Sequence, residues 1–107
     1  MDNFHYLTRA LIMDKGKVLV AKAKGASNTF LPGGHIEFGE KAEEALVREI
    51  DEELGQDAIV KNFRGAVEHT WMEESVNFEV NLVFDVEISG ISSDEPPSSR
   101  EGYLSFI

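Results

Sequence analysis

Residues 34–55 read GHIEFGEKAEEALVREIDEELG, and this stretch decides the fold. Its apolar residues recur at helical spacing and predict a helix over about 41–54, with Gly55 as the C-terminal stop. The apolar side comprises Ala42, Leu46 and Ile50, with Val47 and Leu54 at its edge. A helix with one apolar side must pack that side on another layer of the protein.

Three glutamates lie beside the apolar side of this helix. Glu49, Glu52 and Glu53 stand at i, i+3 and i+4, so they share an arc of roughly 100°. Carboxylates this close repel one another, by a few tenths of a kcal/mol per pair on an exposed helix. A bridging cation would reverse the sign of that interaction. Arg48 is adjacent and could fix one carboxylate through a bidentate contact.

The segments around the helix have mostly strand character. Alternating apolar residues and turn signals predict a hairpin around Asp14-Lys15-Gly16 and a second reversal at 72–75. The expected strands are 4–13, 17–23, 59–71, 76–88 and 103–107, with loops at 24–28 and 90–100. One helix in a mostly β chain makes the fold class α+β, and residues 1–107 form a single domain.

Composition limits the possible partners. The 107 residues are 42% hydrophobic, contain no cysteine and carry a net charge of −10. Absence of cysteine excludes disulfides and thiolate chemistry. The negative charge argues against binding to nucleic acid or anionic membranes. There is no membrane-length apolar run, and Met1-Asp2-Asn3 begins no signal peptide, so we expect a cytoplasmic protein.

Other side chains each have a functional interpretation and a plainer one. Three cations flank the predicted cleft and could bind substrate phosphates, although solvated strand charges are the commoner case: Arg9, Lys22 and Lys24. Two histidines could be metal ligands, but without a second histidine at metal spacing we favour hydrogen-bonding roles: His35 and His69. Three aromatic residues could stack on a base, but we favour core packing: Phe30, Trp71 and Phe78.

The stretch resembles the signature of the Nudix hydrolases. The matching pattern is Gly34, five residues, Glu40, seven residues, Arg48-Glu49-Ile50, one residue, Glu52-Glu53, one residue, Gly55. The preceding residues from Phe30 through Pro32-Gly33 and the order of strands also resemble the family. This resemblance implies an α/β/α sandwich with a mixed β-sheet. It also implies a pyrophosphohydrolase that cleaves a nucleoside diphosphate linked to another moiety.

The resemblance implies a role for each matching residue. Glu49, Glu52 and Glu53, with the backbone carbonyl of Gly33, would bind Mg²⁺ or Mn²⁺, which prefer oxygen ligands. Arg48 would orient the neighbouring carboxylates, and Glu40 would hold the loop against the helix. Water would attack phosphorus while a carboxylate takes its proton. The acceptor is either a glutamate of the helix or Glu101, with Asp94 and Glu95 as weaker candidates.

The sequence departs from the family pattern in three places. Gln56 replaces the usual bulky aliphatic residue, and Lys41 stands where Ser or Thr often caps the helix, with Glu43 and Glu44 expected to compensate. Family members usually continue past the last strand into a closing helix, whereas this chain stops at Ile107. From this we expect a C-terminally truncated domain and a possible homodimer.

Two alternatives to the enzyme remain at this stage. One is a degenerate Nudix domain that serves as a nucleotide-binding or regulatory module, although the intact glutamate set counts against it. The other is a simple acidic cation binder, which leaves Pro32-Gly33-Gly34 and Arg48 unexplained. The sequence does not distinguish among nucleotide substrates such as an NTP, a dNTP or ADP-ribose.

Overall fold

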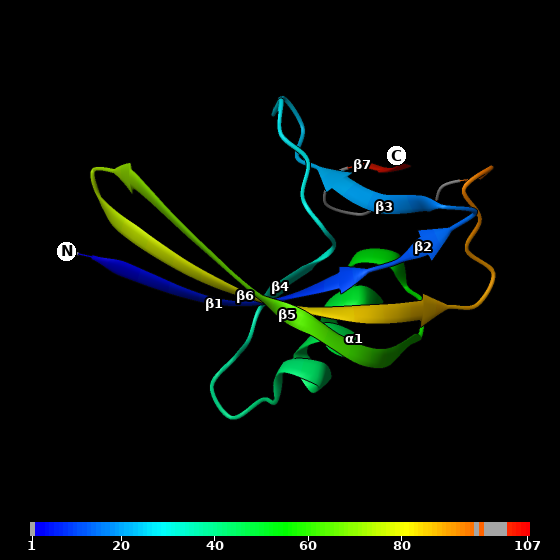
Figure 1. Cartoon of the computed structure of the whole chain (residues 1–107), viewed down its shortest axis with the longest axis horizontal. Helices are drawn as coiled ribbons and strands as arrows, with labels where there is room; N and C mark the ends of the chain where they lie inside the picture. The colour runs from blue at the N-terminus through cyan, green and yellow to red at the C-terminus, as the bar shows by residue number, and fades with distance from the viewer. Residues whose placement is uncertain (1, 96, 98–102) are drawn as a thin grey trace.

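The computed structural model describes residues 2–95, 97 and 103–107. Two sheets and one helix make up the described part of the chain (Figure 1). The strands are β1 (Asn3–Leu11), β2 (Met13–Asp14), β3 (Lys17–Lys22), β4 (Gly33–His35), β5 (Ala58–Glu73), β6 (Ser75–Ile88) and β7 (Tyr103–Phe106), and the helix is α1 (Ala42–Leu54). The α+β class with a mixed sheet is confirmed.

The larger sheet has the strand order β4-β1-β6-β5. Strand β1 runs parallel to β6 and antiparallel to β4, whereas β5 and β6 form a long antiparallel hairpin. The smaller sheet has the order β2-β3-β7, with both pairs antiparallel. Figure 1 shows the β5–β6 hairpin and the start of β1 extending well beyond the helix.

Helix α1 matches its predicted bounds because both ends are fixed locally. At the N-terminus, the Lys41 backbone N–H donates to the Glu44 carboxylate at 2.9 Å, so Glu44 compensates for the missing Ser or Thr cap. At the C-terminus, Gly55 adopts the left-handed conformation and its N–H donates to the Asp51 carbonyl at 2.8 Å.

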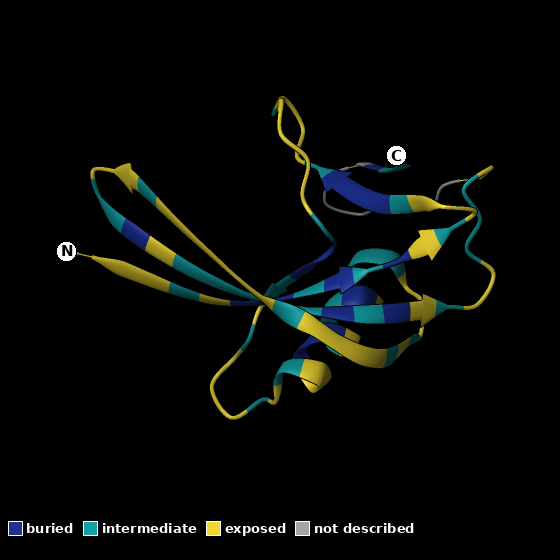
Figure 2. Ribbon diagram, viewed as in Figure 1, coloured by how far each residue is buried: buried dark blue, intermediate teal, exposed yellow. Residues whose placement is uncertain are grey.

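The core joins the helix to both sheets. Leu46 and Ile50 of α1 are fully buried, and they belong to one cluster with residues of β1, β3, β6 and β7. The other buried members are Ala10, Ile12, Leu19, Ala21, Phe84, Val86 and Leu104. Figure 2 shows this buried region around α1, while the extended hairpin is mostly exposed or half-buried. The helix is therefore anchored by its apolar side, which leaves its glutamate side at the edge of the sheet.

Some element boundaries differ from those predicted. The reversal expected at 72–75 is confirmed, but it narrows to a tight turn at Glu74, so β5 and β6 pair up to Glu73 opposite Ser75. The first expected strand divides into β1 and β2 around Ile12. Residues 33–35 were not predicted as a strand but form β4, because they pair with β1. In the described residues, no helix has the length and apolarity needed to span a bilayer.

Candidate active site

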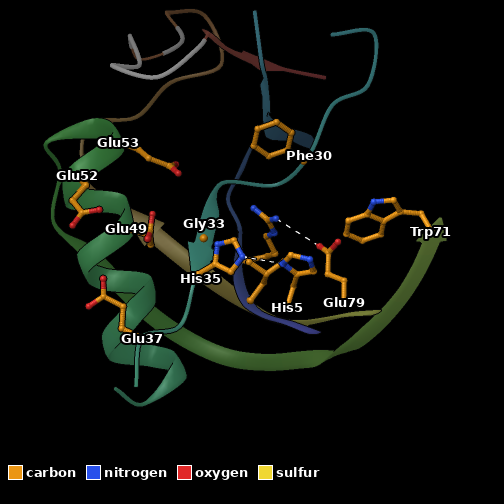
Figure 3. A pocket seen from close by; sticks show the side chains of 13 residues that line it. His5, Phe30, Gly33, His35, Glu37, Glu49, Glu52, Glu53, Trp71 and Glu79 are labelled. Carbon is orange, nitrogen blue, oxygen red and sulfur yellow. Dashed lines mark hydrogen bonds and ion pairs between the residues drawn. The ribbon is translucent and has the colours of Figure 1, made fainter. Parts of the chain in front are cut away.

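A pocket of about 580 Å³ lies between α1 and the larger sheet. In Figure 3 Glu49 and Glu53 of α1 face it from one side, Gly33 lies between, and Trp71 and Glu79 face it from the sheet. Its lining residues are His5, Leu7, Arg9, Phe30, Gly33, Gly34, His35, Glu37, Glu49, Glu52, Glu53, Trp71 and Glu79. We call this cavity the main pocket. It brings together the three predicted metal glutamates, Gly33 and one of the three predicted phosphate-binding cations.

Arg48 ties α1 to the loop before it. Its Nε and Nη2 donate to the two carboxylate oxygens of Glu40 at 2.8 and 2.9 Å, and Nη2 also donates to the His35 carbonyl at 3.1 Å. The bidentate partner of Arg48 is therefore Glu40, and this pair holds the loop against the helix. The Arg48 donors, with the Glu37 backbone N–H, lower the pKa of Glu40 to about 2, and Glu40 in turn raises the pKa of Arg48.

Arg48 also donates hydrogen bonds to two of the three predicted metal-binding glutamates. Its Nη1 donates to Glu49 at 3.0 Å and to both oxygens of Glu52 at 3.3 Å. Glu49 is largely buried, with 16% of its side chain exposed, whereas Glu52 is half exposed. Glu53 lines the same pocket. Across the described residues, no three acidic or imidazole side chains converge closely enough to enclose a metal ion as they stand.

Two consecutive glycines bring the sheet close to these carboxylates. Gly33 and Gly34 of β4 stand opposite Arg9 and Thr8 of β1. A Cβ on Gly33 would overlap the Thr8 carbonyl oxygen, and a Cβ on Gly34 would lie 2.5 Å from the Glu49 carboxyl carbon. Only glycine allows both approaches, so the Pro32-Gly33-Gly34 segment sets how closely Glu49 approaches the sheet.

Arg9 is held rigidly on the sheet side of the pocket. Its Nε donates to the Asn81 side chain at 3.1 Å and its Nη1 to the Leu31 carbonyl at 3.2 Å, while its guanidinium lies 5.6 Å from the centre of the Phe30 ring. Burial lowers the pKa of Arg9, and the nearby Glu79 opposes that shift. Of the three cations predicted to bind substrate phosphates, Arg9 lines the main pocket, whereas Lys22 and Lys24 do not.

Histidine and tryptophan side chains form the far wall. The imidazoles of His5 and His35 are in hydrogen-bonding contact at 3.3 Å, and His5 also contacts the Asn77 side chain at 3.1 Å. The indole of Trp71 stacks on His5 and on His69, with ring centres 5.5 and 5.4 Å apart. The hydrogen-bonding role expected for His35 is confirmed.

The core positions expected for the aromatic residues were wrong. Trp71 is half-buried on the pocket wall, and Phe30 and Phe78 are exposed by 42% and 47%. Sequence reasoning also missed His5 and Glu79. The available signal was alternation, because His5, Leu7 and Arg9 are spaced to share one face of β1.

The loop carboxylates proposed as proton acceptors lie elsewhere or outside the described residues. Asp94 pairs with Lys15 at 2.7 Å next to the β2–β3 turn, and of the described residues neither it nor Glu95 lines the main pocket. Glu101 falls outside the described residues. The acidic groups that do line the pocket are therefore those of α1 and its preceding loop, together with Glu79.

Comparison with known proteins gives a family and a fold. The NUDIX domain model matches residues 5–98. An ADP-ribose pyrophosphatase of Methanocaldococcus jannaschii is 36% identical over 85 residues, which is 75% of this chain and 48% of that protein. The chain thus spans about half the length of this relative.

Solved structures agree on the architecture. A MutT Nudix hydrolase from Burkholderia pseudomallei superposes with a TM-score of 0.76 at 25% identity, over 98% of this chain and 83% of that one. A Nudix hydrolase from Nitrosomonas europaea gives a TM-score of 0.74 at 19% identity, over 96% and 71% of the two chains, and is similar in fold alone.

Proposed function

Since this chain belongs to the NUDIX family, we propose that it is a divalent-metal-dependent pyrophosphohydrolase acting on a nucleoside diphosphate linked to another moiety. The observation that carries this proposal is the gathering of Glu49, Glu52 and Glu53 in one pocket against the Gly33-Gly34 segment. A net charge of −10 suits a small phosphorylated substrate whose charge is neutralised by cations better than it suits a nucleic acid.

The oxygen donors of the main pocket fit a hard divalent cation. Glu49, Glu52 and Glu53, with the Gly33 carbonyl, would hold Mg²⁺ or Mn²⁺. When bound, the metal neutralises charge on phosphoryl oxygens and lowers the pKa of a coordinated water. To bind the metal, the Glu52 side chain would rotate from Arg48 toward the pocket. Its contacts with Arg48 are long, at 3.3 Å, and it is half exposed, so breaking them costs little free energy.

The remaining roles fall to residues on both sides of the pocket. Arg9 would contact a substrate phosphate, because its guanidinium is fixed by Asn81 and the Leu31 carbonyl and needs no further ordering. Arg48 would keep Glu49 oriented while Glu40 holds Arg48 itself. A glutamate of α1 would accept the proton from the attacking water, with Glu101 as the alternative acceptor.

A metal-dependent assay tests this function. The protein is incubated with Mg²⁺ and a panel of NTPs, dNTPs, ADP-ribose and dinucleoside polyphosphates, and release of phosphate or nucleotide products is followed. We expect hydrolysis of at least one compound and a loss of about 100-fold or more for Glu53→Gln, in line with removal of one metal ligand. Glu43→Gln, on the exposed first turn of α1, is the matched control and should retain activity.

The same panel distinguishes the alternatives. Nucleotides that raise the unfolding temperature without being hydrolysed would support a binding module in place of an enzyme. Binding of Mg²⁺ with no response to any nucleotide would leave only the acidic cation binder. Full activity in Glu53→Gln would refute the residue assignment but not the reaction.

A further inference from the structure

A second cavity of about 250 Å³ adjoins the main pocket. The two share Arg9, Phe30 and Glu79, so they are continuous across one face of the larger sheet. The other lining residues of the second cavity are Leu31, Val67, His69, Asn81 and Val83. We call this cavity the ring slot.

The walls of the ring slot are apolar and incompletely covered. Phe30 is 42% exposed and Val67 is 57% exposed, although both lie beside a cavity that could shield them. Val83 and Leu31 extend the apolar surface. A planar ring inserted here would cover these side chains and remove them from water, as aromatic ligands do in most small-molecule sites.

Glu79 is the polar group with unmet hydrogen-bonding capacity at the boundary of the two cavities. Only 15% of its side chain is exposed, and its nearest cation, Arg9, is 3.8 Å away, beyond hydrogen-bond distance. In the part of the chain that the structure describes, its carboxylate receives no hydrogen bond. A carboxylate can only accept, and the oxygens of Glu79 are open to the two cavities instead of being sealed from water. The site can therefore take a ligand that brings N–H donors.

We propose that the ring slot binds a guanine-type base, whose ring N–H and adjacent amino group both donate to Glu79. Guanine presents two neighbouring donors on this edge, hypoxanthine keeps only the ring N–H, and adenine sets a ring acceptor beside its amino donor. Of these three bases, guanine best matches the two acceptor oxygens of the Glu79 carboxylate. Arg9, shared by both cavities, would then lie where the nucleoside meets its phosphates. This assignment rests on the proposed function and narrows its substrate class to guanosine-type nucleotides.

Trp71 provides a direct measure of binding. It is the single tryptophan of the chain, lines the main pocket and stacks on His69 of the ring slot. Its fluorescence is titrated with GMP, IMP and AMP without divalent cations, so no hydrolysis is involved. We expect GMP to bind about 10-fold more tightly than IMP, the discrimination typical of one well-placed additional donor, with AMP weaker still.

Three variants test whether Glu79 and the ring slot produce the preference for GMP over IMP. Glu79→Gln should reduce the GMP-to-IMP ratio to about 1–2, because an amide presents one donor where guanine needs an acceptor. Glu87→Gln, on the same strand but exposed and outside both cavities, should keep the wild-type ratio. Val67→Phe should weaken GMP binding several-fold by filling the slot, and its exposed position keeps it compatible with folding.

The outcomes separate this inference from the proposed function. Equal affinity for GMP and IMP, no response to any monophosphate, or an unchanged ratio in Glu79→Gln would overturn the ring slot. A GMP preference without Mg²⁺-dependent hydrolysis of any guanosine diphosphate derivative would support the slot and refute the enzyme. Hydrolysis with no base preference would support the enzyme and refute the ring slot.

Discussion

Two adjacent glycines allow the position of Glu49 to be tested separately from the stability of the fold. In Gly34→Ala, the new Cβ would lie 2.5 Å from the Glu49 carboxyl carbon and 2.6 and 2.7 Å from its oxygens. Since non-bonded carbons prefer about 3.5–4.0 Å, the carboxylate must retreat by about 1 Å. It is the end of a flexible side chain, so the fold adjusts easily, but a 1 Å displacement of a catalytic group can cost about 100-fold in rate.

Gly33→Ala is the matched variant in which the new Cβ meets backbone instead of a side chain. Its Cβ would overlap the backbone oxygen of Thr8, and its φ of 143° lies in a region that side-chain-bearing residues rarely adopt. Here strand β4 itself must shift from β1. We expect a loss of about 2–4 kcal/mol in the free energy of unfolding, which corresponds to a melting temperature lower by about 10–20 °C for a domain of this size.

Three measurements on both variants decide the outcome. They are the melting temperature, Mn²⁺ affinity by titration, and kcat/KM for the best substrate of the Mg²⁺ panel. Gly34→Ala should melt within about 3 °C of the wild type, with weakened Mn²⁺ binding and kcat/KM reduced about 100-fold. Wild-type kcat/KM in Gly34→Ala would refute the placement of Glu49, and a wild-type melting temperature in Gly33→Ala would refute the tight β1–β4 approach.

Three further predictions concern the stability of the fold. Ile50→Ala, which empties a fully buried position of the core, should lower the free energy of unfolding by about 2–5 kcal/mol in urea titrations. Because the pKa of Glu40 is lowered from 4.5 to about 2, the stability supplied by its bonds to Arg48 is present above pH 4.5 and lost as pH falls toward 2. The urea midpoint of Glu40→Gln should therefore change less between pH 4.5 and pH 2 than the midpoint of the wild type. An equal pH dependence of the two midpoints would contradict this. Lys15→Ala should alter stability by no more than about 0.5 kcal/mol, since its pair with Asp94 is exposed on both sides; a larger loss at low salt that shrinks at high salt would contradict this.

Sequence reasoning predicted the helix and its glutamates because the information there is local. The spacing of Leu46 and Ile50 and the glycine at 55 determine the element, and the i, i+3, i+4 spacing then places Glu49, Glu52 and Glu53 together. Local patterns also predicted the hairpins to within a few residues. The three-residue strand β4 carried no such pattern, since its strand character comes from pairing with β1.

The sheet side of the site depends on pairings between distant segments. His5, Glu79 and His69 stand in one cross-strand row because β1 pairs in parallel with β6 and β6 antiparallel with β5. The register of those pairs is set by the packed core and cannot be seen in any single strand. For the same reason Phe30 and Trp71 looked like core residues, since an aromatic side chain in a strand is apolar whichever face it occupies.

The parallel pairing of β1 with β6 also determines when the larger sheet can form during synthesis. Asn3 lies opposite Asn77 and Leu11 opposite Asp85, so β1 is synthesised more than sixty residues before the strand with which it pairs. Until then β1 can pair with β4 alone, and apolar residues such as Leu7 and Ala10, buried in the finished protein, lie at an incomplete sheet edge. Such distant pairings slow folding and prolong exposure to misassembly. One of the two inner strands of this sheet, β1, therefore stays exposed at an edge until β6 has been synthesised.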